Sequence, residues 1–493
     1  MATQEASGTT GVATATAAAS AAETNASDKP KLQKAKYAVQ FGYCGAGYHG
    51  LQTNADPTHP TVEDVLMGAL HKAGLVADSN MDDPFHKLGW QRASRTDKGV
   101  SALRNLASAK LLRQLDGDEA AVDRVNQFLP DAIRLYGLQP VTASFNSHLH
   151  CTGREYEYYL PTYALLPKAT FQELLPTSLA PAEPSREMAD EPPVPKPFAS
   201  DTIVAADDAD DADGEPEGGA GKNNNTNKRN RRGGDRNDRG DTKAARAEDG
   251  PAAAADASSS EKFFMFKSIP PDAAARLRAH RITPDALERA RALFRMYEGT
   301  QSFHNFTPKG DPSDARMTRF MRKIRVSDPL IVRASLQTGE LVGDDVANDD
   351  NVVELEFVRV ELDGQSFMMN QIRKMIGTVC TILAAGLDAG DMRSCLEKSV
   401  QRGMPMAPAN GLFLVDLFFD RYNYTLERIQ GEGSNARDRQ PIVMANVPTS
   451  RVDHVRRRVL ASIVREELAH DIFGRWMRGT RFIAKLAWGM DLE

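Results

Sequence analysis

One long segment of biased composition divides this chain and limits what the rest of it can fold into. Residues 164–261 contain a proline-rich stretch, an acidic run, three consecutive asparagines and a short basic run at 228–232. Such a segment buries too little apolar surface to offset the entropy lost on ordering, so we expect a disordered insertion. Two foldable blocks then remain, at 37–163 and at 262–424.

The two ends of the chain differ in character. Residues 1–36 are rich in Ala, Thr and Ser and end in a lysine cluster without an apolar core, which favours a disordered tail over a secretory signal. Residues 425–493 predict a helical extension, because apolar residues recur there at helical spacing. They are Val452, Val455, Val459, Leu460 and Ile463. The arginines at 456–458 either contact nucleic-acid phosphates or form a solvated face, and the solvated face is favoured.

The formal net charge of −6 is unevenly distributed. Residues 164–250 hold 18 acidic and 12 basic residues, which leaves 49 of each in the rest of the chain. A nucleic-acid site must therefore be a local basic patch. Four scattered cysteines without a C-x-x-C pair indicate neither a disulfide framework nor a zinc site. No apolar run reaches the 18 residues typical of a membrane span.

Strand-like and helix-like patterns alternate in both blocks. Strands are expected where apolar and polar residues alternate or β-branched residues cluster, and helices where apolar residues recur every three or four positions. The expected strands are 37–43, 105–112, 155–160, 352–362 and 412–419, and the expected helices include 62–73, 284–297 and 369–387. This mixture favours an α+β or α/β layered fold over a helix bundle or a β-sandwich.

The polar segment at 91–100 has the strongest chemical character. Asp97 lies among Arg92, Arg95 and Lys98, and Gly99 allows a sharp turn. A carboxylate beside cations has a lowered pKa and stays ionised, so Asp97 is a candidate nucleophile or general base. Taken alone, the segment is better explained as a surface turn with ion pairs worth about 0–1 kcal/mol each.

Two other clusters allow alternative readings. The glycine- and aromatic-rich segment 41–50 is neither a dinucleotide loop nor a P-loop. Its Tyr43 and Tyr48, together with Tyr156, form either a stacking platform for bases or part of a packed core. His148 and His150 suggest metal ligation, but no third ligand is near in sequence, which favours structural or RNA-facing histidines.

Residues 95–102, Arg-Thr-Asp-Lys-Gly-Val-Ser-Ala, resemble the active-site motif of tRNA pseudouridine synthases of the TruA family, and most closely its eukaryotic branch. Further segments resemble other motifs of that family, in the expected order through both blocks. They are 42–52, 126–134, 145–147, 154–158, 297–307, 365–377 and 407–414. The insertion and both tails lie outside the resemblance.

The resemblance implies chemical roles for three side chains. Asp97 would be the catalytic carboxylate, attacking either C1′ of the ribose or C6 of the uracil. Arg373 would pair with Asp97 and keep it ionised in a desolvated site. Tyr156 would stack on the everted uracil, with a role in proton transfer at C5 left open.

The resemblance also implies the surroundings of that carboxylate. Arg95 would help to displace the target base, whose extrusion costs a few kcal/mol. Leu412 and Leu414 would line the pocket. The implied fold is α+β, with a mixed, largely antiparallel sheet flanked by helices, and two similar halves that enclose a central basic cleft.

The implied activity is the isomerisation of specific uridines to pseudouridine in tRNA. The reaction needs no redox change, so no metal or organic cofactor is expected. Small nuclear RNA and mRNA as further substrates, and a monomeric or dimeric state, stay open. The expected location is the nucleus, with the mitochondrion as an alternative. The rival functions are a non-catalytic tRNA-binding or chaperone protein on the same fold and a nucleoside glycosidase that releases free base.

Overall fold

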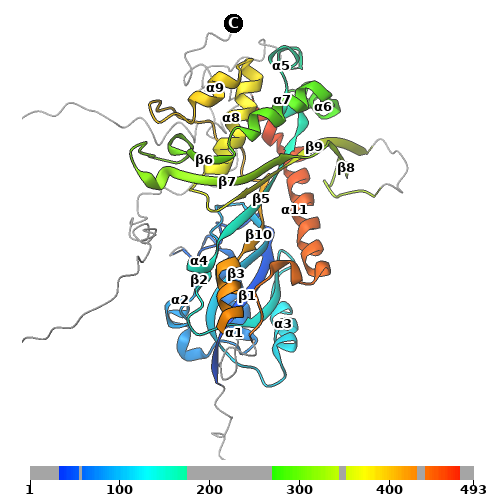
Figure 1. Cartoon of the computed structure of the whole chain (residues 1–493). Coiled ribbons are helices and arrows are strands. Elements are labelled where there is room, and N and C mark those ends of the chain that lie inside the picture. Colours follow the sequence, from blue (N-terminus) through cyan, green and yellow to red (C-terminus); the bar gives the residue numbers. More distant parts are fainter. Residues whose placement is uncertain (1–32, 55–57, 175–268, 344–350, 430–438, 478–493) are drawn as a thin grey trace, which may run out of the picture.

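The computed structural model describes residues 33–54, 58–174, 269–343, 351–429 and 439–477 (Figure 1). Most of the tail expected at 1–36 and of the insertion expected at 164–261 therefore lies outside the described residues. Where they are described, the folded blocks extend further than the sequence indicated. The first strand begins at Lys34, and Ala164, Leu165 and Leu166 are buried in the core.

The centre of the molecule is one continuous sheet that joins both blocks. Its order is β4-β1-β3-β10-β5-β9-β7-β6, with β2 paired to β3 and β8 paired to β9. The strands are β1 (Lys34–Tyr43), β2 (Gln91–Arg92), β3 (Ser101–Leu112), β4 (Ile133–Pro140), β5 (Gly153–Pro161), β6 (Gly299–Ser302), β7 (Thr318–Val326), β8 (Leu330–Ser335), β9 (Val352–Gly364) and β10 (Leu412–Phe418).

Most neighbouring strands in the sheet are antiparallel, and the exception lies at its middle. β10 runs parallel to β3, with Phe413 opposite Ser101 and Leu414 opposite Ala102. On its other side β10 is antiparallel to β5. The expected mixed, largely antiparallel sheet is therefore confirmed. The last strand along the described chain lies between strands of the first block and so connects the two blocks directly.

Helices cover both faces of this sheet. Their bounds are α1 (Val62–Lys72), α2 (Pro84–Lys87), α3 (Asp118–Asn126), α4 (Ser147–His150), α5 (Lys168–Leu174), α6 (Pro271–Ala279), α7 (Pro284–Arg295), α8 (Gln371–Ala385), α9 (Ala389–Ser394), α10 (Asp420–Ile429) and α11 (Thr449–His470). Within the described ranges, no helix combines the length and the apolar character needed to cross a bilayer.

Local sequence signals explain where several helices begin and end. Thr61 caps α1: its side chain accepts from the Asp64 backbone N–H, and the Asp64 side chain accepts in return from the Thr61 backbone N–H. Thr283 caps α7 with Pro284 in the first turn. α8 ends at Gly386, whose φ of 74° is the left-handed conformation that glycine adopts readily.

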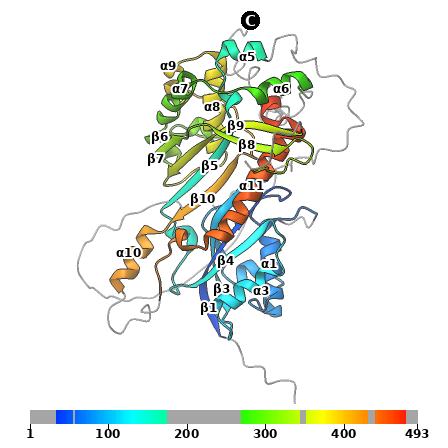
Figure 2. The ribbon, with the colours of Figure 1, turned by 90° about the vertical axis from the view of Figure 1, so that its right-hand side faces the viewer.

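Alternating side chains separate the core into two layers. One layer, here called the front layer, contains Tyr156, Tyr158, Leu412 and Leu414 and is covered by α1, α7 and α8. The other, here called the rear layer, contains Tyr159 and Phe413 and is covered by the apolar stripe of α11. In Figure 2, α11 lies across the sheet and spans the lower and upper parts of the molecule. The helical extension expected from Val452 to Ile463 is confirmed as this helix.

Candidate active site

Asp97 lies on the loop that connects β2 to β3. Val100 N–H donates to the Asp97 carbonyl at 3.0 Å, and Gly99 has a φ of +77°, so the chain turns sharply after the carboxylate. The Asp97 side chain remains accessible to solvent, although protein surrounds most of it. The carboxylate is therefore partly surrounded by protein, and lies neither inside a sealed core nor on a free loop tip.

Arg373 approaches this carboxylate from the other block. It lies in the first turn of α8, is largely buried, and its Nε donates to the Ala407 carbonyl at 2.8 Å. Burial raises the pKa of Asp97, and the positive charge of Arg373 lowers it in part. The sequence analysis predicted a lowered pKa, and that prediction is wrong in sign because loss of hydration outweighs the nearby cation.

Tyr156 lies close enough to Asp97 for the two groups to interact electrostatically. Its ring is 7% exposed, and its hydroxyl lies 3.0 Å from Ser94 Oγ at the start of the Asp97 loop. The Phe367 ring meets it edge-on, with centroids 5.1 Å apart and ring planes at 78°. Burial raises the pKa of Tyr156 above its usual value, so the phenol is protonated at neutral pH.

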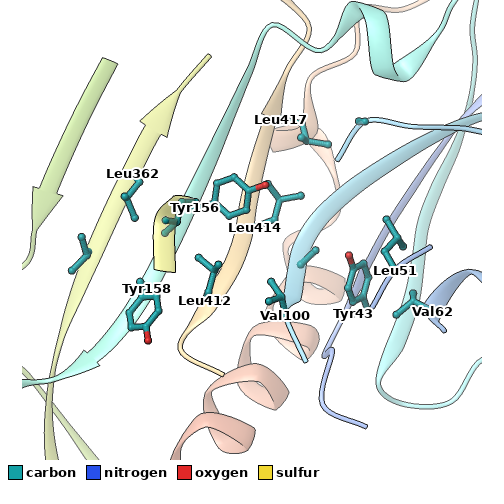
Figure 3. Close-up of a cluster of buried hydrophobic side chains, with 14 of the residues drawn as sticks. Tyr43, Leu51, Val62, Val100, Tyr156, Tyr158, Leu362, Leu412, Leu414 and Leu417 are labelled. Carbon is teal, nitrogen blue, oxygen red and sulfur yellow. The ribbon is translucent and has the colours of Figure 1, made fainter. Parts of the chain in front are cut away.

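Leu412 and Leu414 belong to β10, beside Tyr156. In the β5–β10 register, Leu412 lies opposite Tyr158 and Leu414 opposite Tyr156. Figure 3 shows Leu414 next to the Tyr156 ring, with Leu412 and Tyr158 further along the same face. Both leucines are buried, at 7% and 0% exposure, so they form the apolar floor beneath the tyrosine.

Arg95 is exposed and lies two residues before Asp97 on the same loop. The structure thus brings Arg95, Asp97 and Tyr156 together from the first block. Leu412 and Leu414 reach the same region on the inserted strand β10, and Arg373 reaches it on α8.

Arg154 is a residue of this site to which the sequence analysis gave no role. It occupies the same face of β5 as Tyr156, two residues earlier. One Nη donates to the Ala93 carbonyl at 2.7 Å, and the other donates to the Gln365 carbonyl at 3.2 Å. Arg154 therefore links the loop of Asp97 to the loop that leads into α8. The only sequence signal for it is the spacing Arg-x-Tyr on a strand.

The alternative sites considered from sequence are explained by packing. The His150 ring stacks on Phe145 at 5.4 Å, and its Nδ1 forms a hydrogen bond with the backbone of Asn146, either to the carbonyl or from the N–H according to the tautomer. Among the residues that the structure describes, no three His, Cys, Asp or Glu side chains gather as metal ligands would. Tyr43 is fully buried and so offers no ring face for a base to stack on.

Comparison with known proteins identifies the family of the chain. A family model described as tRNA pseudouridine synthase matches residues 293–420. tRNA pseudouridine synthase 1 of Schizosaccharomyces pombe is 34% identical over 430 residues, which cover 80% of this chain and 74% of that protein. The chain belongs to the tRNA pseudouridine synthase family.

Other members of the synthase family are similarly related. tRNA pseudouridine synthase 1 of Candida albicans is 34% identical, over 81% of this chain and 59% of that protein. The pseudouridylate synthase 1 homolog of Mus musculus is 26% identical, over 82% of this chain and 64% of that protein. Across five fungal synthases, the chain spans between 59% and 67% of their length.

The synthase family model and the structural site overlap in part. Its matched segment contains Arg373, Leu412 and Leu414, whereas Asp97 and Tyr156 precede that segment. The family model therefore covers the second block, whereas the alignment with the Schizosaccharomyces pombe synthase extends over 80% of the chain. The structure places the carboxylate of the first block beside the second block.

Proposed function

We propose that this protein isomerises uridine to pseudouridine in tRNA, with Asp97 as the catalytic carboxylate. The observation that carries the proposal is that Asp97, Tyr156 and Arg373, which belong to separate elements, lie close enough for the Asp97 charge to interact with both of the other groups. A protein that only binds RNA has no need for a partly desolvated carboxylate under the influence of a buried guanidinium.

The chemistry follows from these environments. The ionised Asp97 attacks C1′ of the ribose or C6 of the uracil, and the N-glycosidic bond breaks. The base turns and rejoins the ribose through C5, and the bond to Asp97 breaks, which regenerates the carboxylate. The C5 proton is then lost and N1 gains a proton, so that the product is an isomer of the substrate. Tyr156, protonated and backed by Leu414, offers a ring for the uracil to stack on, which is worth about 1–3 kcal/mol. The positive charge of Arg373 opposes protonation of Asp97, whose carboxylate is partly desolvated.

RNA binding requires the target base to leave its stack. We propose that Arg95, exposed beside Asp97, occupies part of the space vacated by the everted base and so offsets a few kcal/mol of unstacking. We further propose that the two blocks act as similar halves that bind tRNA in a basic cleft at their junction. Family membership and the joining of the blocks at β10 support this arrangement.

The decisive experiment compares the wild type with Asp97→Ala and Asp97→Asn on unmodified tRNA, with chemical detection of pseudouridine. We expect the wild type to form pseudouridine, and both variants to lose at least 10³-fold in rate while binding tRNA, because they lack the nucleophile. Asp78→Asn is the matched control, since its side chain is 99% exposed and far from the site. Activity that survives in both Asp97 variants refutes the proposed role.

The same assay separates the rival functions. A non-catalytic tRNA-binding or chaperone protein would form no pseudouridine in the wild type, and a glycosidase would release free uracil. Replacing tRNA with small nuclear RNA or mRNA in the assay tests whether these are further substrates. We propose a nuclear location, supported by the basic run at 228–232, which lies outside the described residues. Fluorescence microscopy of the protein with this run replaced by serine tests it.

A further inference from the structure

The loop that carries Asp97 has an inward and an outward side. Ser94 and Thr96 are buried, at 6% and 8% exposure, whereas Arg95 and Asp97 between and after them are exposed. Successive side chains of an extended segment point in opposite directions. The two residues that face the site are therefore held by two hydroxyl residues that face the protein interior.

Those hydroxyl residues take part in a buried hydrogen-bond network. The Tyr43 hydroxyl, from the end of β1, lies 2.7 Å from Thr96 Oγ1. Asn105 of β3 uses its Nδ2 to donate to the Tyr43 hydroxyl at 3.4 Å and to the Ser94 carbonyl at 3.1 Å. Either oxygen of the Tyr43–Thr96 pair can be the donor, so the two hydroxyl groups are each other's buried hydrogen-bond partner. Ser94 Oγ continues the network to the Tyr156 hydroxyl at 3.0 Å.

The backbone of the glycine-rich segment supports the same loop. Leu51 N–H donates to the Thr96 carbonyl at 3.2 Å, and Gly99 N–H donates to the Tyr48 carbonyl at 3.3 Å. Gly50 has a φ of +90°, and a Cβ built on it would lie 3.0 Å from the Thr96 oxygen. The segment between β1 and α1 thus lies directly against the Asp97 loop, and glycine permits the close approach.

We infer that Tyr43, Thr96 and Ser94 are positioning residues, which together fix the Asp97 carboxylate relative to the Tyr156 ring. The inference rests on the proposed function, since it concerns the geometry of that reaction. The network reaches both groups at once: Thr96 is the residue before Asp97, and Ser94 contacts the Tyr156 phenol. None of the three needs to touch the substrate.

The expected size of the effect follows from geometry. A displacement of about 1 Å between reacting groups costs on the order of 10²-fold in rate. The backbone contacts keep the loop attached when the Thr96 hydroxyl is lost, but its side chain no longer has a polar partner inside. The carboxylate one residue later is then free to rotate away from the base, while the surface that binds RNA is unchanged.

The test compares Thr96→Val, which replaces the hydroxyl by a methyl group, with Thr96→Ser, which keeps it. Single-turnover rates of pseudouridine formation are measured at saturating tRNA, together with the Kd for tRNA. We expect Thr96→Val to lose about 10- to 100-fold in rate with Kd unchanged within twofold. Thr96→Ser is expected to stay within about threefold of the wild type. If Thr96→Val does not fold, Tyr43→Phe makes the same comparison, because it keeps the aromatic volume.

Tyr136→Phe is the control for loss of stability alone. Tyr136 is as deeply buried as Tyr43, and its hydroxyl donates to the Leu103 carbonyl at 2.7 Å in the rear layer of the core. We expect it to lower the melting temperature by a similar amount as Tyr43→Phe, with an unchanged rate. Wild-type rates in both Thr96→Val and Tyr43→Phe overturn the inference alone. An inactive wild type, or an active Asp97→Ala variant, overturns the proposed function itself.

Discussion

At the scale of single residues, the site is governed by the balance between burial and charge. Arg95 and Lys98 are close to Asp97 in sequence, but both are exposed to water. Solvent screening therefore weakens their electrostatic attraction to the Asp97 carboxylate. Arg373 is distant in sequence but buried, so its charge is less screened. The net result is a carboxyl group whose pKa is raised and which is most sensitive to the loss of that one arginine.

This balance predicts the pH dependence of catalysis. Asp97 must be ionised to attack, so a raised pKa moves the acid limb of the pH–rate profile to a pH above the ordinary value of 3.8. Arg373→Met removes the opposing cation and leaves burial unopposed. We expect the inflection to move to still higher pH and the rate below it to fall, in single-turnover assays from pH 4 to 8.

Arg393→Met is the control for this experiment, because Arg393 is an exposed arginine on α9. It should leave the position of the inflection unchanged. An Arg373→Met profile that keeps the wild-type inflection would show that Arg373 does not act on Asp97 electrostatically.

At the scale of elements, α11 serves as a structural brace. Arg456 donates to Glu157 at 3.2 Å, and Arg458 pairs with Asp131, so two of its three consecutive arginines are used within the protein. The helix covers the rear layer, opposite the face of Tyr156. The shallow hollow that Arg457 and Arg458 border with Leu341 is on that far side as well. The sequence analysis favoured a solvated face over contact with RNA. Arg456 and Arg458 instead form ion pairs within the protein, and only Arg457 of the three is exposed without such a pair among those described.

The α11 contacts predict different effects for adjacent arginines. Arg456→Ala removes a charged hydrogen bond from the buried Glu157 carboxylate, and we expect it to cost about 1.5–3 kcal/mol in the free energy of unfolding. Arg457→Ala should change it by no more than about 0.5 kcal/mol. Urea unfolding measures both. Neither variant should alter tRNA affinity, and a loss of affinity in Arg457→Ala would restore the RNA-binding hypothesis.

Elements were predictable where their signals are local. The helix from Val62, the helix from Pro284 and the strand from Leu412 are all found close to their predicted bounds. The parallel pairing of β3 with β10 was not predictable. The two strands are about 310 positions apart, and the local pattern of apolar residues in one strand does not indicate which distant strand it pairs with. Phe413 and Ser101 look like ordinary strand residues in isolation.

The site was predictable only in part for the same reason. From residue chemistry alone, Asp97 was better explained as part of a surface turn, and its importance came from a motif resemblance. Tyr43 was a candidate for stacking, yet it is buried because β1 lies between β3 and β4 with both faces covered. Thr96 lies in the motif at 95–102, but nothing there indicated a role for its hydroxyl group, since the buried partner is visible only once β1 and the loop are in place.

At the scale of the whole molecule, the boundary of the undescribed segment 175–268 is informative. The described part of the chain stops at the end of α5 and resumes just before α6, and these two helices contact each other. Ile269, the first described residue after that segment, is buried against the core. The fold therefore needs a connection between these points but not a long one.

This arrangement predicts that residues 175–268 can be replaced by a Gly/Ser linker of roughly ten residues. We expect pseudouridine formation on tRNA to stay within about twofold of the wild type. Shortening the connection roughly tenfold should stabilise the protein by at most about 2 kcal/mol, because each halving of a loop lowers the closure cost by about 0.6 kcal/mol. Calorimetry and the single-turnover assay measure these two effects. A large loss of rate would assign the segment a part in RNA binding.

The position of β10 has a consequence for biosynthesis. Its partners β3 and β5 are translated some 250 to 310 residues earlier, and each presents an unpaired strand edge until residue 418 has left the ribosome. Bare edges of this kind pair readily with other chains. We therefore expect the growing polypeptide to be prone to aggregation until β10 has been synthesised, and a fragment that stops before β10 to aggregate more readily than the full chain.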